Sequence, residues 1–376
     1  MHRAHKIRLY PNNKQATYFA KASGTARFAY NWALARAKEQ YEQDSSVKFN
    51  EAALRKELNA IKKEKFLWMY EVTKCAPQLA IKNSLNNAFR KFFKGEANFP
   101  KFHKKGVRDS FSLSNDQFKV NGNSIQVPHI GNVKLAETLR FEGKILSATI
   151  SRKADHWYVS IQVEVATPLP VHTAISENQA IGVDVGVKTL AALSDGTEFA
   201  GNKPSRRYEK KLRRLQQSLS RKQGSREGEK KSNNYRKQRT KVSRLHEKIA
   251  NSRNDGIHKL TTMLTQNYSL IGIEDLNIKG MVKNHNLARS IHDQSWYELS
   301  RQLIYKAETS GTHVHYSDRF FASSQLCNDC GSKNPEVKDL SVRQWVCPNC
   351  GTLHDRDINA AENLKQDAIK TVLSVK

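Results

Sequence analysis

Three acidic residues stand where a globular protein rarely places a charge. Asp184 lies in the apolar run GVDVG, Glu274 ends the run IGIE, and Asp357 begins the last amphipathic segment. A carboxylate in an apolar strand is costly to bury unless it is paired or binds metal. Any one of them could be a capping or ion-paired acid. Three converging at one end of a sheet would suit two Mg²⁺ ions, which prefer oxygen ligands and assist phosphodiester cleavage.

Four of the five cysteines form two Cys-x-x-Cys pairs. They are Cys327 and Cys330 in CNDC, and Cys347 and Cys350 in CPNC. Two facing turns of this kind supply four thiolates at tetrahedral corners, which suits structural Zn²⁺. With four protein ligands the zinc ion would have no open position, so it would not be the catalyst. The start MHRAHKIRLY lacks an apolar signal core, which favours a metal site in a reducing cytosol over disulfides.

The chain of 376 residues is strongly basic. It has 63 Lys and Arg against 36 Asp and Glu, a net charge of +27. Such a charge points to a polyanionic partner, although a basic protein with no such partner is the alternative. No segment approaches the roughly 18 apolar residues of a membrane span, so nucleic acid is favoured over a membrane. We expect a cytoplasmic protein associated with the nucleoid.

Two segments concentrate this charge. Residues 203–253 carry 19 Lys and Arg against 4 Glu, and their pattern predicts two helices joined by the polar turn GSREGEKKSNN. The pair could be a solvated coiled-coil-like hairpin, but the unbalanced charge favours nucleic acid. Residues 90–106 interleave basic and aromatic side chains, which suits a phosphate-tracking, base-stacking surface; a loop that caps a core is the alternative. The residues expected to contact phosphate are Lys101, Lys104, Lys105, Arg206, Arg207, Lys210, Lys211, Arg213, Arg214, Arg236, Lys237 and Arg239.

The hydrophobic period changes twice in the first half of the chain. Residues 14–95 repeat with a helical period, whereas residues 96–178 show short alternating runs typical of antiparallel strands. The run IRLYP within residues 1–13 also reads as a strand. We therefore predict a small β-barrel formed by residues 1–13 and 96–178, with a helical domain inserted between them. A linker begins at Pro168.

Residues 179–376 form a second predicted domain of α/β class. Three short strands come first, followed by the basic hairpin of residues 203–253 and the buried strand SLIGIE. A helix, the strand HVHYSDRF, the zinc ribbon of residues 321–352 and an amphipathic helix complete the domain. The two acidic strands would form one sheet, with the hairpin and the ribbon as insertions.

These features, in this order, resemble TnpB, a family of transposon-encoded RNA-guided DNA endonucleases related to the type V CRISPR effectors. The matching stretches are RLYPN, NFPKFHKKG, GVDVGVK, GIEDLNIKGM, SSQLCNDCG, CPNCG and HDRDINAAENL. The resemblance implies an RNase H-like nuclease core of RuvC type, a wedge barrel and a recognition domain. It also implies that Asp184, Glu274 and Asp357 hold two catalytic Mg²⁺ ions.

The same resemblance implies two partners and leaves alternatives open. The partners are a guide RNA from the transposon end and double-stranded target DNA beside a short motif, with one protein monomer per RNA. A guided repressor or RNA-binding module with a vestigial nuclease core is one alternative, against which the three retained acids argue. A strand-joining transposase is the other. In HDRD we expect Asp357 to be catalytic and Asp355 to be a helix cap or an outer partner.

Overall fold

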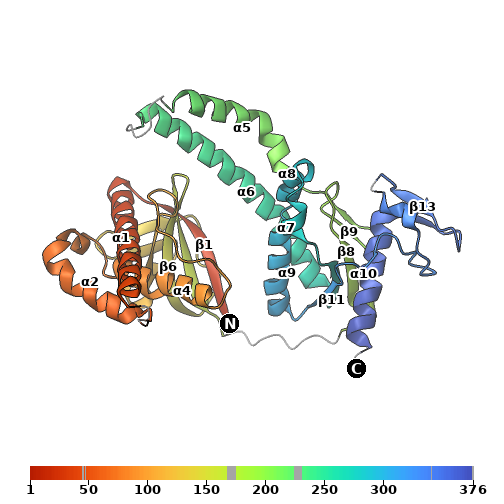
Figure 1. Ribbon diagram of the computed structural model, residues 1–376, viewed down its shortest axis with the longest axis horizontal. Helices are drawn as coiled ribbons and strands as arrows, with labels where there is room; N and C mark the ends of the chain where they lie inside the picture. Colours follow the sequence, from red (N-terminus) through yellow and green to blue (C-terminus); the bar gives the residue numbers. More distant parts are fainter. Residues whose placement is uncertain (45, 47, 167–174, 224–230, 340, 375–376) are drawn as a thin grey trace. The chain divides into compact units, whose positions relative to one another are not determined.

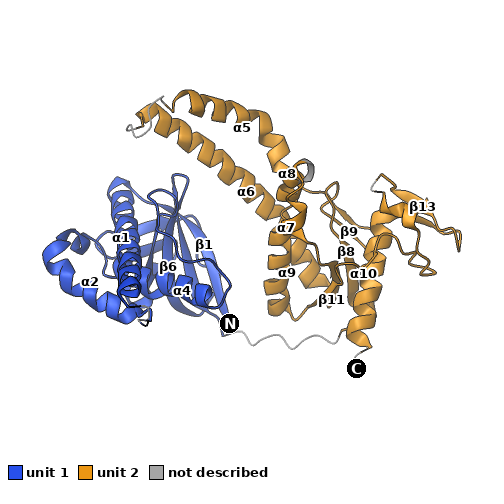
Figure 2. Cartoon of the chain, in the orientation of Figure 1, with its two compact units in different colours: residues 1–167 blue, residues 168–376 orange. Residues whose placement is uncertain are grey.

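The computed structural model describes the chain except residues 45, 47, 167–174, 224–230, 340 and 375–376. It forms two compact units, residues 1–167 and 168–376 (Figure 2). Most of the predicted linker therefore lies outside the described residues. Within the described part, every helix is too short or too polar to span a bilayer.

Unit 1 is built on a seven-stranded antiparallel sheet of order β2-β6-β7-β1-β5-β4-β3. Its strands are β1 (His2–Tyr10), β2 (Ser110–Ser114), β3 (Lys119–Asn121), β4 (Ser124–Val127), β5 (Gly131–Leu135), β6 (Lys144–Lys153) and β7 (His156–Glu164). The N-terminal strand β1 lies mid-sheet, with Ile7 opposite Val159 and Leu9 opposite Leu135. Among the described residues the end strands β2 and β3 do not pair with each other. The strand pairing is therefore that of an open sheet, whereas a small β-barrel was predicted.

The segment between β1 and β2 is mainly helical. It contains α1 (Asn13–Gln43), α2 (Glu51–Lys65), α3 (Cys75–Leu79), a π-helical stretch (Ala80–Leu85) and α4 (Asn86–Phe93). Asn12 caps α1 by accepting a hydrogen bond from the backbone N–H of Gln15 at 2.9 Å, and the Gln15 side chain accepts one from Asn12 N–H in return. The Phe19 ring of α1 lies 5.2 Å from that of Trp157 on β7. The helices and the sheet thus share one core.

Unit 2 is a three-layer α/β structure (Figure 1). Its sheet has the order β10-β9-β8-β11-β12, in which β8, β11 and β12 are parallel and β9 and β10 antiparallel. The strands are β8 (Ala180–Asp184), β9 (Ala191–Leu193), β10 (Glu198–Phe199), β11 (Leu270–Glu274) and β12 (His313–Ser317). Helix α10 (Arg356–Leu373) covers one face, while α6 (Asn233–Asn267) and α9 (Trp296–Ser310) cover the other.

Two insertions extend from this sheet. The basic hairpin consists of α5 (Pro204–Arg221) and the first half of α6, where the Gln238 amide donates a hydrogen bond to Leu215 O at 3.0 Å. Most of its predicted polar turn falls on residues 224–230, outside the described residues. Two short helices, α7 (Ile278–Met281) and α8 (His285–Gln294), precede α9. The ribbon carries β13 (Gln344–Val346) and β14 (Leu353–Asp355), and β14 runs directly into α10.

Candidate active site and zinc ribbon

Asp184 and Glu274 are the last residues of two neighbouring parallel strands. β8 and β11 pair in register up to Val183 and Ile273, so the next residue on each strand is an acid. Each acid also lies in a backbone ladder with an outer strand, β9 for Asp184 and β12 for Glu274. Pairing on both sides therefore fixes the two acids together at the carboxyl edge of the sheet.

A glycine stands two residues before each of these acids, and helix α10 lies directly against both glycines. A Cβ atom on Gly182 would overlap the backbone carbonyl oxygen of Ala361, and one on Gly272 would overlap that of Leu364. Gly182 and Gly272 are themselves paired across the two strands. No residue with a side chain would let the helix backbone come this close to the sheet.

This contact determines where Asp357 lies. Strand residues two apart share a face, so Asp184 points to the same side as Gly182, toward α10. On the helix, Asp357 lies one turn before Ala361, roughly 6 Å nearer the helix start. Along β8, the two residues from Gly182 to Asp184 span about 6.6 Å. This distance matches the distance along α10 from Ala361 back to Asp357. Asp357 is thereby brought to the strand ends that carry Asp184 and Glu274.

The three carboxylates act on one another electrostatically. Burial raises the pKa of Asp184 well above its usual value, and the charges of Glu274 and Asp357 raise it further. Burial also raises the pKa of Glu274, against the lowering effects of a hydrogen bond from Ser323 and the positive charge of Arg356. An all-oxygen cluster that resists ionisation in this way is suited to hold divalent cations, which would favour the charged forms.

The two acids of the HDRD motif, Asp355 and Asp357, have different structural roles. Asp355 ends β14 and caps α10, accepting hydrogen bonds from the backbone N–H groups of Asp357 at 3.0 Å and Ile358 at 3.1 Å. The carboxylate of Asp357 is not used in the cap. It pairs instead with the guanidinium of Arg343 at 3.2 Å, and it adds to the field at Asp184. Asp355 is therefore the helix cap, and Asp357 is the acid of the cluster.

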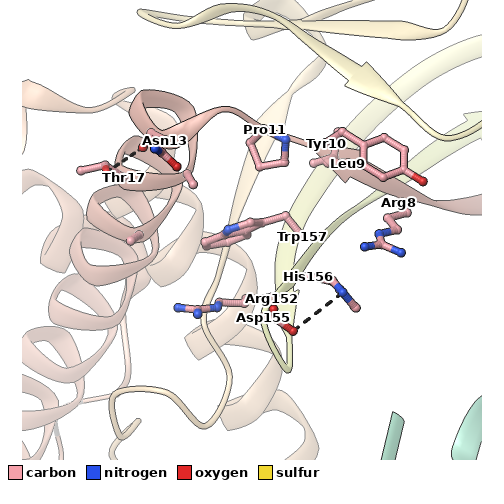
Figure 3. Close-up of a pocket in the computed structure, with 12 residues that line it drawn as sticks. Arg8, Leu9, Tyr10, Pro11, Asn13, Thr17, Arg152, Asp155, His156 and Trp157 are labelled. Carbon is pink, nitrogen blue, oxygen red and sulfur yellow. Dashed lines mark hydrogen bonds and ion pairs between the residues drawn. The ribbon is translucent and has the colours of Figure 1, made fainter. Parts of the chain in front are cut away.

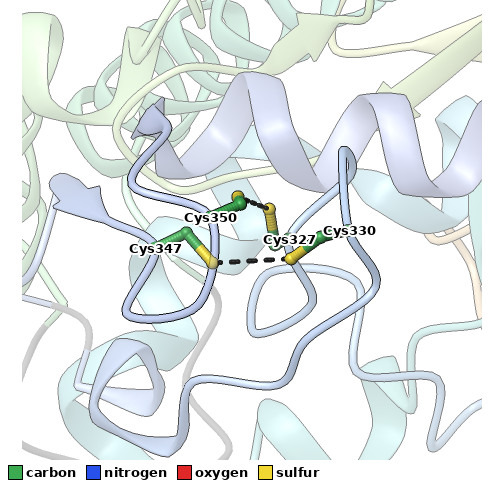
Figure 4. A group of neighbouring side chains, drawn as sticks. All are labelled: Cys327, Cys330, Cys347 and Cys350. Atoms are coloured by element: carbon green, nitrogen blue, oxygen red, sulfur yellow. Dashed lines mark hydrogen bonds between the residues drawn. The ribbon is translucent and has the colours of Figure 1, made fainter.

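The four cysteines of the ribbon meet as their spacing predicts (Figure 4). Their sulfur atoms all lie within 4.8 Å of one another, and Cys327–Cys350 and Cys330–Cys347 are each separated by 3.6 Å. Ligands about 2.3 Å from a tetrahedral zinc ion would stand about 3.8 Å apart. The group therefore fits a structural Zn²⁺ ion.

Two asparagines on α10 tie the ribbon to the same helix that carries Asp357. The Asn363 amide donates to the carbonyl oxygens of Ser323 and Leu326, both at 2.7 Å. The Asn359 amide also donates to Leu326 O at 2.7 Å, and its oxygen accepts from Asn328 N–H at 3.1 Å. The first cysteine knuckle is thus docked on α10, while the second continues into it through β14.

The predicted phosphate-contacting residues are all exposed, and they fall in both units. Lys101, Lys104 and Lys105 lie in the segment between α4 and β2 of unit 1. The others lie on the basic hairpin: Arg206, Arg207, Lys210, Lys211, Arg213 and Arg214 on α5, and Arg236, Lys237 and Arg239 on α6. Exposure leaves these side chains available to phosphate, and their role as contacts stays a prediction.

Unit 1 also contains a basic hollow that the sequence did not indicate. A cavity of about 650 Å³ opens between the start of α1 and the β6–β7 turn, and it is lined in part by Arg8, Tyr10, Arg152, His156 and Trp157 (Figure 3). The Arg8 guanidinium lies 5.2 Å from the centre of the Tyr10 ring. Arginines beside aromatic rings can hold a phosphate and a base, so the hollow joins the candidate nucleic-acid surfaces.

Several residues that position the site were not predicted from the sequence, although some of them have a recognisable pattern in it. Each acidic strand reads Gly-apolar-acid, GVD or GIE, and the glycine marks the helix contact. Asn359 and Asn363 stand four residues apart on the last helix, so they share a face. Ser323 begins the matching stretch SSQLCNDCG, but its residue type gave no sign that its hydroxyl donates to Glu274 Oε1.

Family models match three parts of the chain. A model described as "Probable transposase" matches residues 160–285, one described as "Cas12f1-like, TNB domain" matches residues 296–364, and one described as "Helix-turn-helix domain" matches residues 1–46. In this structure residues 1–46 hold the strand β1 and the single long helix α1. The second match covers the ribbon and the start of α10.

Whole-chain relatives and a solved structure agree with these matches. A Streptomyces pristinaespiralis protein named "Putative RNA-guided DNA endonuclease" is 34% identical over 370 residues, covering 96% of this chain and 88% of the relative. An Escherichia coli K12 protein, "Putative RNA-guided DNA endonuclease InsQ", is 35% identical over 380 residues, covering 96% and 91%. The structure titled "Cryo-EM structure of the Cas12f1-sgRNA-target DNA complex" contains a chain with the same fold, with a TM-score of 0.58 at 14% identity, covering 94% of this chain and 83% of that one. The resemblance read from the motifs is thus confirmed, and the chain belongs to the TnpB family.

Proposed function

We propose that this protein is an RNA-guided DNA endonuclease of an insertion sequence, acting in the cytoplasm on double-stranded DNA beside a short motif. One observation carries the proposal: α10 crosses the paired glycines Gly182 and Gly272 and so brings Asp357 to the strand ends that bear Asp184 and Glu274. Relatives that align over nearly the whole chain bear the name of this activity.

The residues of the cluster would hold two Mg²⁺ ions. Asp184, Glu274 and Asp357 offer only oxygen ligands, and burial raises the pKa of the first two. When bound, such ions supply activation of the attacking water and stabilisation of the leaving oxygen. The Ser323 hydroxyl orients one oxygen of Glu274. The Asp355 cap fixes the first turn of α10 and with it the backbone of Asp357.

The basic surfaces would hold a guide RNA from the transposon end and the target DNA, with one protein monomer per RNA. The hairpin of residues 203–253 carries a net charge of +15, and the nine arginines and lysines named above on α5 and α6 are exposed. Contacts to phosphate position a nucleic acid without reading its sequence. Their strength should fall with salt, with a slope of about −0.7 per neutralised phosphate of a single strand and about −0.9 for a duplex.

The test is cleavage of plasmid DNA by the protein purified with its transposon-end RNA. Linear product should require Mg²⁺, the RNA and a matching target, and it should be absent with Asp184→Ala. A guided repressor would bind the matched plasmid and leave it intact. A transposase would give joined strands and would work without RNA. Either result would overturn the proposal.

A further inference from the structure

The loop that joins β12 to the ribbon, Asp318–Ser323, is tied to the end of β11. The Arg319 guanidinium bonds the Asp275 carboxylate at 2.5 Å, and the Ser323 hydroxyl donates to Glu274 Oε1. Glu274 and Asp275 are consecutive residues, and Glu274 belongs to the acid cluster. The loop therefore lies beside the cluster and is held at both of its ends.

The loop displays one aromatic ring. Phe320 is 90% exposed, more than any other large apolar side chain in the described part of the chain. Its backbone N–H donates to Asp318 Oδ1 at 2.8 Å, and the N–H of Phe321 donates to Asp318 O at 2.9 Å. These bonds make a defined turn, in which Phe321 is half-buried and Phe320 faces solvent.

A single exposed apolar residue is ordinary on a protein surface, so exposure alone carries nothing. Here the ring is three residues from Ser323, which bonds the proposed metal ligand Glu274, and its turn is bonded through Arg319 to the next residue, Asp275. A solvent-exposed phenylalanine ring does not contribute to the free energy of folding, yet the hydrogen bonds of this turn keep the Phe320 ring in solvent. A flat apolar face beside a phosphodiester-cleaving cluster is suited to one ligand class, an unpaired nucleobase.

We propose that Phe320 stacks on a base of the DNA strand being cut, next to the scissile phosphate. This inference rests on the proposed endonuclease function and adds a substrate-positioning residue to it. Stacking accepts any of the four bases, as a guided nuclease needs when its target sequence is set by RNA. By holding the base, the ring fixes the distance from the adjacent phosphate to Asp184 and Glu274. Cleavage requires that this geometry be kept within a fraction of an ångström.

The variants Phe320→Ala, Phe320→Leu and Phe320→Trp, all bound to guide RNA, test the proposal. Phe320→Ala should slow cleavage by about 5-fold to 150-fold, the equivalent of losing ~1–3 kcal/mol of stacking. It should also spread the cut over several positions. Phe320→Leu should behave like Phe320→Ala, because it keeps an apolar side chain but lacks a π-face. Phe320→Trp should restore rate and cut position. Tyr297→Ala, at a 72% exposed tyrosine on α9, is the matched control and should cleave like the parent.

A second readout does not depend on turnover. Target DNA with 2-aminopurine beside the cut site, bound in Ca²⁺ in place of Mg²⁺, should fluoresce more brightly with Phe320→Ala than with the parent or Phe320→Trp, because the base is no longer stacked. Equal fluorescence and equal cut positions for the parent and Phe320→Ala would overturn the inference, as would full activity of Phe320→Leu. A parent complex that fails to cleave at all would instead overturn the proposed function.

Discussion

The strand acids and the helix acid reach the same place by different means. Asp184 and Glu274 are set by backbone pairing between β8, β11 and their outer neighbours. Asp357 has no ladder to hold it. Its position depends on the glycine contacts, on the Asp355 cap and on a ribbon docked through asparagine side chains. The difference teaches that strand pairing fixes two acids of the cluster, while helix packing and side-chain contacts position the third.

The largest expected effect is a loss of cleavage rate that is similar for all three acids. Alanine at Asp184, Glu274 or Asp357 removes a carboxylate from the cluster, and each should lower the cleavage rate by at least about 100-fold, since even outer partners of metal ligands contribute 10–100-fold. Guided binding to matched DNA, measured by gel shift without Mg²⁺, should be unchanged because the basic surfaces are untouched. Loss of binding together with cleavage would mean that the acid supports the fold instead.

The glycine contact should come next. Gly182→Ala or Gly272→Ala must push α10 away from the sheet, which should cost about 1–3 kcal/mol of the free energy of unfolding, as overpacking does. A shift of Asp357 near 1 Å should slow cleavage by about 100-fold. Gly256→Ala on α6 is the matched control, because its Cβ would meet only Asn202 Cβ at 3.8 Å. The melting temperature and the cleavage rate should both fall for Gly182→Ala and Gly272→Ala. Neither should fall for Gly256→Ala.

Removing zinc should displace Asp357 and leave the two strand acids, Asp184 and Glu274, in place. Cys347→Ser should lower zinc content and slow cleavage by about 10-fold to 100-fold, because the second knuckle leads straight into α10. The control is Cys75→Ala, a change at the buried cysteine of unit 1, and this variant should have the same zinc content as the parent protein. If zinc-free protein cleaved at the parent's rate once Mg²⁺ alone was added, the position of Asp357 would not depend on the ribbon.

The cap of α10 should have a smaller effect. Asp355→Ala removes two hydrogen bonds to the first turn and should cost about 0.5–2 kcal/mol of stability. It should slow cleavage less than Asp357→Ala does, compared at equal guide occupancy. Asp355→Ser, which can still cap, should recover most of the loss. An inactive Asp355→Ala beside an active Asp357→Ala would reverse the assignment of the two acids.

The smallest effect is a dependence on pH. Because the pKa of Asp184 is raised in the folded protein, protons compete with cations at higher pH than usual. The Mg²⁺ concentration for half-maximal cleavage should therefore rise as pH falls from 8 to 6. Without metal, the unfolded chain loses this proton at lower pH than the folded chain does, so stability should decline as pH rises. Asp184→Asn, which cannot ionise, should melt at a higher temperature than the parent at pH 8.

The sequence predicted what depends on residue type and spacing. The two acidic strands, the four-cysteine cluster and the amphipathic last helix follow from local pattern, and the structure contains all three. Features that depend on close approach could not be predicted in the same way. The clash that a side chain at Gly182 would cause is visible only when α10 is in place, and so is the bond from Ser323 to Glu274. Alternating runs indicated antiparallel strands in unit 1, but alternation alone does not say whether a sheet closes into a barrel.

The docking of the ribbon has a further consequence for engineering. Its entry, near Ser323 and Leu326, and its exit, at β14, are both fastened to the first two turns of α10. An insertion that leaves these contacts, the cysteines and Arg343 in place should therefore not move Asp357. We expect a tag inserted at the exposed residues 338–339, outside both cysteine knuckles, to move with the ribbon and leave the carboxylates undisturbed.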